Sequence, residues 1–261
     1  MKKNKRQLSK KSLMYVSLGT VLIFIMTFIG AGVFLRIIDI HVEGNYRYTA
    51  EEIIESSGIS LGNNLLFLNI QDVVANIREA NPFVNDVIIT RMMPDEVLIE
   101  IVESTPMASV LVSEQTLIID SVGRVLEKVS SGETGGIVDV WIASLIEVRG
   151  VEPERPELGN TITSTRLDGE TRIQSMLEVL GSLERESIKE NVVYIDVSNI
   201  TNIHLGYLNI YRVNLGGLSQ VRSNIARLGD AVDRIQSDHP GVSGVVNMTD
   251  ATGHIEFRPN H

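Results

Sequence analysis

Histidine is the residue type in this chain that most readily supports acid–base catalysis or metal binding. The five histidines are His41, His204, His239, His254 and His261. No two of them stand at the i, i+4 spacing that builds a metal site from one helix. The chain has no cysteine, so disulfides, thiolate nucleophiles and Cys-ligated metals are excluded. We therefore expect solvent-facing or core histidines, and we predict no metal site and no cofactor.

Two further stretches have residue types that could support catalysis. Glu152, Glu154 and Glu157 form an acidic cluster, and two carboxylates flanking a sugar can hydrolyse a glycosidic bond. Solvated acids in a loop are far commoner, and that is the interpretation we favour. The run 215–218, LGGL, follows a predicted strand and precedes a predicted helix, as phosphate-binding loops do. It lacks the third glycine and the Lys-Ser/Thr pair, so we interpret it as a turn into a helix.

Other catalytic signatures do not occur. There is no Gly-x-Ser-x-Gly elbow, no Ser-x-x-Lys and no Walker loop. We predict that the protein is not an enzyme and has no catalytic residue. The single tryptophan, Trp141, lies in the apolar run VWIASL, where core packing is the expected role.

Charge is distributed unevenly along the 261 residues. Six of the 23 Lys and Arg stand in the first twelve positions, which carry no acid, so the rest of the chain has a net charge near −16. A surface of that sign repels phosphates, which demand clustered cations. We therefore predict that the protein does not bind nucleic acid.

Residues 12–35 carry no charge at all. Such a stretch forms a helix of roughly 36 Å, enough for a hydrocarbon core of about 30 Å. The basic cluster precedes it, so the positive-inside rule predicts a cytoplasmic tail at 1–12, a transmembrane helix at 13–35 and an extracytoplasmic remainder. The alternative, a cleaved signal peptide, would have a shorter apolar core and a small-x-small cleavage site. We therefore expect an uncleaved, single-pass anchor in the plasma (inner) membrane.

After this segment the sequence predicts a small α+β module over residues 36–105. Thr49 and Glu52 have the spacing of a capping box, in which each side chain bonds the other residue's backbone N–H. Asn69 can cap a second helix, which must end before Pro82. The expected order is strand, helix, helix, strand, strand, with strands at 37–44, 87–91 and 97–102.

A second module follows over 106–258, with a short tail at 259–261. Short strands recur, and Gly123 is available for a positive φ in the turn between two of them. Residues 149–165 read as a surface loop, and two amphipathic helices are expected at 168–186 and 218–237. We expect a curved, mixed β-sheet backed by these two helices. The predicted strands are 109–112, 116–120, 124–129, 140–148, 192–196, 202–205, 207–213, 245–248 and 254–258.

The last two strands are of special interest because a strand near the C-terminus can lie at the edge of its sheet. An open edge leaves a row of unpaired N–H and C=O groups, to which another chain can add a strand. The residues alone leave two alternatives open, an ordinary protected edge or a docking edge.

Several sequence motifs of the chain, and the order in which they follow one another, resemble a known family. The stretches VEGNYRYTAEEI, NPFVNDVIITRMMPDEVLIEIVESTPMA, LIIDSVGRVLEK and VVYIDVSNITNIHLG are similar to the bacterial cell-division protein family FtsQ, called DivIB in Gram-positive bacteria. The resemblance covers nearly the whole chain. It implies that 36–105 is a POTRA-like domain and that 106–258 is the β-domain of this family.

The resemblance also implies a function and a binding site. Members are non-enzymatic bitopic scaffolds at the division septum, which bind small bitopic division proteins of the FtsL and DivIC/FtsB type within the septal peptidoglycan synthase complex. The implied partner-binding residues are Thr249, Asp250, Thr252, Gly253, His254, Ile255, Glu256 and Phe257. Two alternatives stay open: a membrane-anchored cell-wall enzyme, and a POTRA-type chaperone for secreted or outer-membrane β-proteins.

Overall fold

The structure, a computed structural model, describes residues 10–130, 137–250 and 253–260. The chain forms two compact units, and each is described by itself. The first contains residues 1–81 and 85–103, and the second contains residues 82–84 and 104–261. The second unit continues from Ser104, two residues before the predicted start of the second module at 106.

Helix α1 (Lys10–Phe34) covers the segment for which the sequence predicts a membrane helix. Residues 1–9 of the predicted cytoplasmic tail lie outside the described residues. In the part of the chain that the structure describes, no helix has both the length and the hydropathy needed to cross a membrane. The membrane helix therefore stays a prediction.

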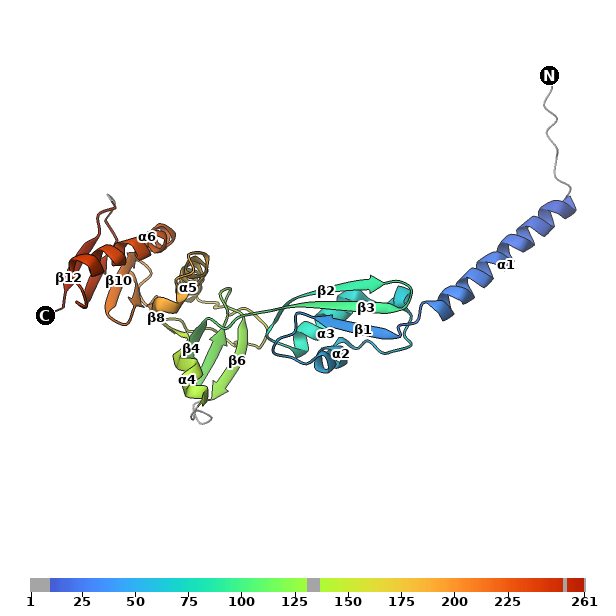
Figure 1. Ribbon diagram of the computed structural model, residues 1–261, viewed down its shortest axis with the longest axis horizontal. Coiled ribbons are helices and arrows are strands. Elements are labelled where there is room, and N and C mark those ends of the chain that lie inside the picture. Colours follow the sequence, from blue (N-terminus) through green and yellow to red (C-terminus); the bar gives the residue numbers. More distant parts are fainter. Residues whose placement is uncertain (1–9, 131–136, 251–252, 261) are drawn as a thin grey trace, which may run out of the picture. The chain divides into compact units, whose positions relative to one another are not determined.

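The rest of the first unit has the predicted order of strand, helix, helix, strand, strand (Figure 1). Its three strands form one sheet in the order β1-β3-β2, with β1 and β3 parallel and Asp39 opposite Glu96. The core consists of fully buried aliphatic side chains, among them Ile53, Leu65 and Ile99. The elements are β1 (Asp39–Glu43), α2 (Ala50–Ser57), η1 (Leu65–Phe67), α3 (Ile70–Ala80), β2 (Val84–Met92) and β3 (Glu96–Glu103).

Side-chain caps fix where the two helices of this unit begin. Thr49 accepts a hydrogen bond from the Glu52 N–H at 3.2 Å, and the Glu52 carboxylate accepts from the Thr49 N–H at 2.8 Å. This is the predicted capping box. Asn69 caps α3 by accepting from the Gln71 N–H at 3.2 Å. Both starts could be read from the sequence because capping depends on local spacing alone.

The second unit is a nine-stranded mixed sheet in the order β12-β11-β10-β9-β8-β7-β4-β5-β6. The pairs β4–β7, β7–β8 and β10–β11 are parallel, and the remaining pairs are antiparallel. The elements are β4 (Ala108–Val112), β5 (Gln115–Ile119), β6 (Val125–Ser130), α4 (Ile137–Ala143), β7 (Ile146–Arg149), α5 (Leu167–Arg185), η2 (Lys189–Asn191), β8 (Val192–Asp196), β9 (Ile203–Tyr207), β10 (Tyr211–Gly216), α6 (Leu218–Asp238), β11 (Gly244–Asn247) and β12 (Glu256–Pro259).

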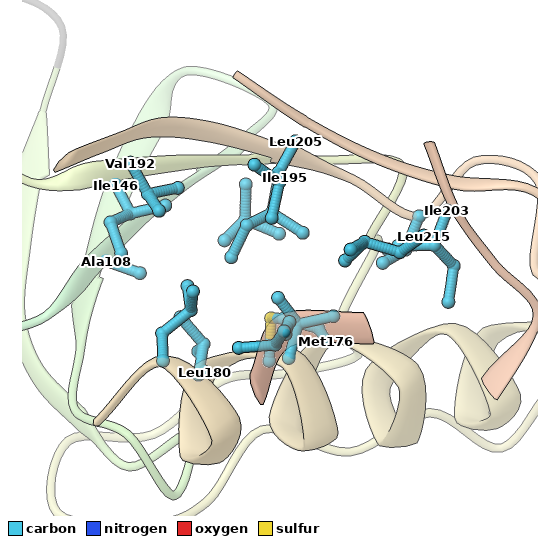
Figure 2. Packing of buried hydrophobic residues seen from close by; sticks show 14 of the residues in the cluster. Ala108, Ile146, Met176, Leu180, Val192, Ile195, Ile203, Leu205 and Leu215 are labelled. Carbon is cyan, nitrogen blue, oxygen red and sulfur yellow. The ribbon is translucent and has the colours of Figure 1, made fainter. Parts of the chain in front are cut away.

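The core of this unit lies between the sheet and the helices α5 and α6. Figure 2 shows Met176 and Leu180 of α5 pointing toward Ile195 and Leu205 of the sheet. Val221, Ile225, Leu228, Val232 and Ile235 of α6 are buried, as the four-three repeat predicts. The expected sheet backed by two helices is therefore present.

Two strand predictions in this unit are wrong. The range 140–148 was expected to be one strand, but α4 runs to Ala143 and only β7 is extended. A short apolar run such as VWIASL does not distinguish helix from strand by periodicity. The range 207–213 was also expected to be one strand. The chain turns within it, with Leu208 and Asn209 at φ of 52° and 59°. No glycine or proline marks this turn.

Candidate partner-binding edge

The candidate site is the last strand of the second unit. β12 stands at one end of the sheet order, and no strand of the described chain pairs with its outer side. Of the predicted residues, Glu256 and Phe257 lie on β12, while Thr249, Asp250, Gly253, His254 and Ile255 lie in the segment that leads to it. Thr252 lies outside the described residues. The strand was expected at 254–258, whereas β12 begins at Glu256 and ends at Pro259.

The register identifies the backbone groups that the outer edge offers. Asn260 donates its N–H to the Ser243 carbonyl at 2.9 Å, and Val246 stands opposite Phe257. Because backbone groups alternate sides along a strand, the N–H and C=O of Phe257 point away from β11. Pro259 points the same way but offers only a carbonyl. An added strand therefore has one donor and two acceptors at its disposal on β12.

The opposite edge of the sheet is partly covered. The N–H of Val125, the first residue of β6, donates to Asn160 at 2.9 Å, and the Val125 carbonyl accepts from Gly159 at 2.8 Å. Residues 159–160 thus take the place of a neighbouring strand at the start of β6. The start of β6 is therefore not available to another strand, whereas no strand of the described chain pairs with the outer side of β12.

Phe257 fixes β12 against the unit. Its ring meets Tyr211 edge-on at a centroid distance of 6.0 Å and His239 at 5.4 Å. It also covers Gly244 of β11, where an added Cβ would lie 2.5 Å from a ring carbon of Phe257. The absence of a side chain at 244 therefore allows the ring to approach the neighbouring strand closely.

Helix α6 holds the segment before β12 with three polar side chains on one face. Gln220 donates to the Thr249 carbonyl at 3.1 Å, and buried Asn224 donates to the carbonyls of Leu215 and Met248 at 3.0 and 2.9 Å. Arg227 donates to the Gly253 carbonyl at 3.3 Å. Residues at i, i+4 and i+7 share one helix face, so a single helix positions the entry to the edge strand.

A cavity of about 370 Å³ lies between α6 and β12. Charged and polar side chains line it together with apolar ones. It is lined by Ala231, Arg234, Ile235, Asp238, His239, Gly253, His254, Ile255 and Phe257.

The other face of β12 carries a charge pair. Arg258 donates to both carboxylate oxygens of Glu256, at 2.9 and 3.0 Å. This hydrogen bond lowers the pKa of Glu256 below its usual value. Arg258 is not among the predicted site residues, although it stands two positions after Glu256 and so lies on the same face of the strand.

The other candidate catalytic or metal-binding residues do not form a common site in the part of the chain that the structure describes. Glu152, Glu154 and Glu157 are exposed, and the last two accept hydrogen bonds from Thr165 and Asn160 of the same loop. The run 215–218 is a turn into α6, with Gly216 at a φ of 76°. Across residues 10–130, 137–250 and 253–260, no three His, Cys, Asp or Glu side chains are placed to hold a metal ion.

Comparison with known proteins shows which domain family the first unit resembles. Residues 35–104 match the family model of the POTRA domain, FtsQ-type. The chain thus contains a POTRA domain of the kind that occurs in FtsQ, followed by a mixed-sheet domain.

Curated relatives extend the similarity beyond this domain. The cell division protein DivIB of Clostridium tetani is 28% identical over 68% of this chain and 62% of its own. DivIB of Clostridium botulinum is 25% identical over 80% of this chain and 76% of its own, and FtsQ of Syntrophotalea carbinolica is 28% identical over 56% and 48%. The matched region is thus under two thirds of the length of the first relative. The resemblance to the FtsQ/DivIB family of cell-division proteins is confirmed.

Proposed function

We propose that this protein is a non-enzymatic, membrane-anchored scaffold of the bacterial division machinery. The charge-free segment 12–35 and its basic flank support an anchor with the N-terminus in the cytoplasm. The two folded units then lie outside the cell membrane, at the division septum. The open edge β12 is the observation that carries the proposal.

The partner binds by adding a strand to β12. The outward groups of Phe257 supply main-chain hydrogen bonds, and the cavity beside them takes a side chain of the added strand. The partners are small bitopic division proteins of the FtsL and DivIC/FtsB type, whose capture helps to assemble or regulate septal peptidoglycan synthesis. Anchoring both proteins in one membrane raises their effective concentration at each other's site.

Amide hydrogen exchange tests the mode of binding. In the free protein the N–H of Phe257 faces outward and exchanges fast, whereas the N–H of Arg258 faces β11 and is protected. Addition of the extracytoplasmic segment of the partner protects Phe257 and leaves Arg258 as it was. Binding with no change at Phe257 would refute strand addition.

Photo-crosslinking in dividing cells tests the location. Probes replace the exposed residues Asp250, His254 and Arg258, with controls at the equally exposed Glu154 and Arg78. Adducts with a small membrane protein at the first three positions alone support this edge. Adducts only at the controls would move the interface elsewhere.

A further inference from the structure

One end of the POTRA domain exposes an unusual number of large apolar side chains. Phe67 is 74% exposed, Leu61 67% and Met93 61%. They belong to the loop around η1 and to the turn between β2 and β3, and Ile38, which is 64% exposed, directly precedes β1. We call this set the apolar rim, and its members are Ile38, Leu61, Leu66, Phe67, Met92 and Met93.

Backbone hydrogen bonds bring these segments to the residues that follow α1. Leu65 donates its N–H to the Leu35 carbonyl at 2.7 Å, and Ile37 donates to the Asn63 carbonyl at 2.8 Å. The turn is joined on the other side, where Ile38 donates to the Asp95 carbonyl at 2.8 Å. The rim therefore surrounds the point at which the chain leaves the charge-free segment 12–35.

A side-chain bond ties the two rim segments to each other. The Arg91 guanidinium, beside the turn, donates to the Leu68 carbonyl at 2.7 Å. β3 starts at this end with Glu96 and runs for eight residues to Glu103, near which the chain leaves the domain (Figure 1). The rim thus lies where the chain enters the domain, opposite the end where it leaves.

The rim has no role in the core of the domain. Fully buried residues such as Ile53, Leu65 and Ile99 form that core. Single exposed apolar residues are ordinary, but a group of six from separate segments on one end marks a contact surface. Since the rim adjoins a segment with the length of a bilayer core, its neighbour is the lipid surface.

We infer that the apolar rim dips into the outer interface of the membrane and holds the POTRA domain against it. The inference rests on the proposed anchor. Charges near the rim have no positive excess, since Arg36 and Arg91 stand close in sequence to Asp39, Asp95 and Glu96. Insertion is thus driven by apolar burial and does not need anionic lipid.

Fluorescent labels on the full chain in phosphatidylcholine nanodiscs test this contact. The chain has no cysteine, so Phe67→Cys and Met93→Cys each give a single labelling site. Tyr46→Cys is the matched control, because Tyr46 is 91% exposed and its N–H binds Glu103 at the far end of β3. Phe34→Cys, at the end of α1, reports on the anchor.

Quenching by a shallow nitroxide lipid separates the outcomes. We expect the labels at 34, 67 and 93 to be quenched at least threefold more than the label at 46. Quenching at 34 alone would overturn the inference and keep the anchor. No lipid quenching at 34 would overturn the anchor and the inference with it.

A variant pair shows whether the apolar side chains cause the contact. The triple change Leu61→Asn, Phe67→Asn and Met93→Asn should reduce quenching of a label at Met92→Cys to the level of position 46. The control Ile88→Asn with Val102→Asn changes side chains exposed by 51% outside the rim and should have no effect. Both variants should melt like the parent. Undiminished quenching in the triple variant would refute the role of the rim.

Discussion

Asn224 of α6 should be essential for the stability of the second unit and for the position of its edge strand β12. Its side chain is 2% exposed, and it supplies hydrogen-bond donors to the carbonyls of Leu215 and Met248. The Asn224→Ala change leaves both carbonyls without that donor. A buried polar group that loses its partner costs about 1–3 kcal/mol, so for two carbonyls the free energy of unfolding should fall by about 2–6 kcal/mol.

Urea denaturation measures this loss. Trp141 is the single tryptophan and belongs to the second unit, so its fluorescence follows that unit alone. With a slope of about 2 kcal/mol per molar urea, the midpoint should fall by about 1–3 M. In the parent protein the Arg227 guanidinium donates to the Asn224 side-chain oxygen at 2.5 Å. Asn224→Asp keeps this acceptor but loses both amide donors, so it should be at least as unstable as Asn224→Ala.

The neighbouring residue provides the control. Ser223 is exposed, and its hydroxyl donates a hydrogen bond to the Gln220 carbonyl of the same helix. Ser223→Ala should therefore stay within about 0.5 kcal/mol of the parent. An Asn224→Ala variant that unfolds at the midpoint of Ser223→Ala would refute the claim that this amide stabilises the entry to β12.

Three further changes test separate parts of the β-domain. Gly244→Val places its side chain against the ring of Phe257 and the Arg258 carbonyl, each 2.5 Å from the position of the new Cβ, so exchange of the protected Arg258 amide should become at least tenfold faster; unchanged exchange there would contradict this packing. Burial lowers the pKa of His204, so the unfolded chain binds the extra proton and stability falls as pH drops below about 6.5. His204→Gln should lose less melting temperature than the parent between pH 7.5 and 5.5, and an equal loss would remove His204 as the cause. The Arg222 guanidinium lowers the pKa of Glu178, so the pair stabilises above the ordinary glutamate pKa of about 4.3 and this gain disappears as pH falls below it. Arg222→Ala should therefore melt below the parent at pH 7 in low salt and equal it at pH 3, and a constant difference would contradict the linkage.

The sequence was sufficient wherever a signal is local. The capping box of Thr49 and Glu52, the positive φ of Gly123 and the buried stripe of α6 all follow from spacing within one or two turns. It was insufficient where tertiary packing decides. The apolar run around Trp141 forms a helix, and the turn at Leu208 and Asn209 has no glycine.

The candidate site shows the same division. A strand near residue 256 could be expected from its alternating side chains, but the sheet order that puts β12 at an edge depends on long-range pairing. The hydrogen bonds that Gln220, Asn224 and Arg227 donate to the segment before β12 could not be predicted from the sequence either. Polar residues on a helix face look like a solvent face until the partner carbonyls are known.

The parallel pairing of β1 with β3 has a consequence for how the first unit forms. Asp39 of β1 stands opposite Glu96 of β3, which is made 57 residues later. During synthesis β1 therefore emerges first and waits without a partner, while β2 and β3 can pair as soon as their short turn is complete. Folding of this unit should start in its last hairpin and finish at its first strand, so the strand nearest the proposed anchor is the last to dock.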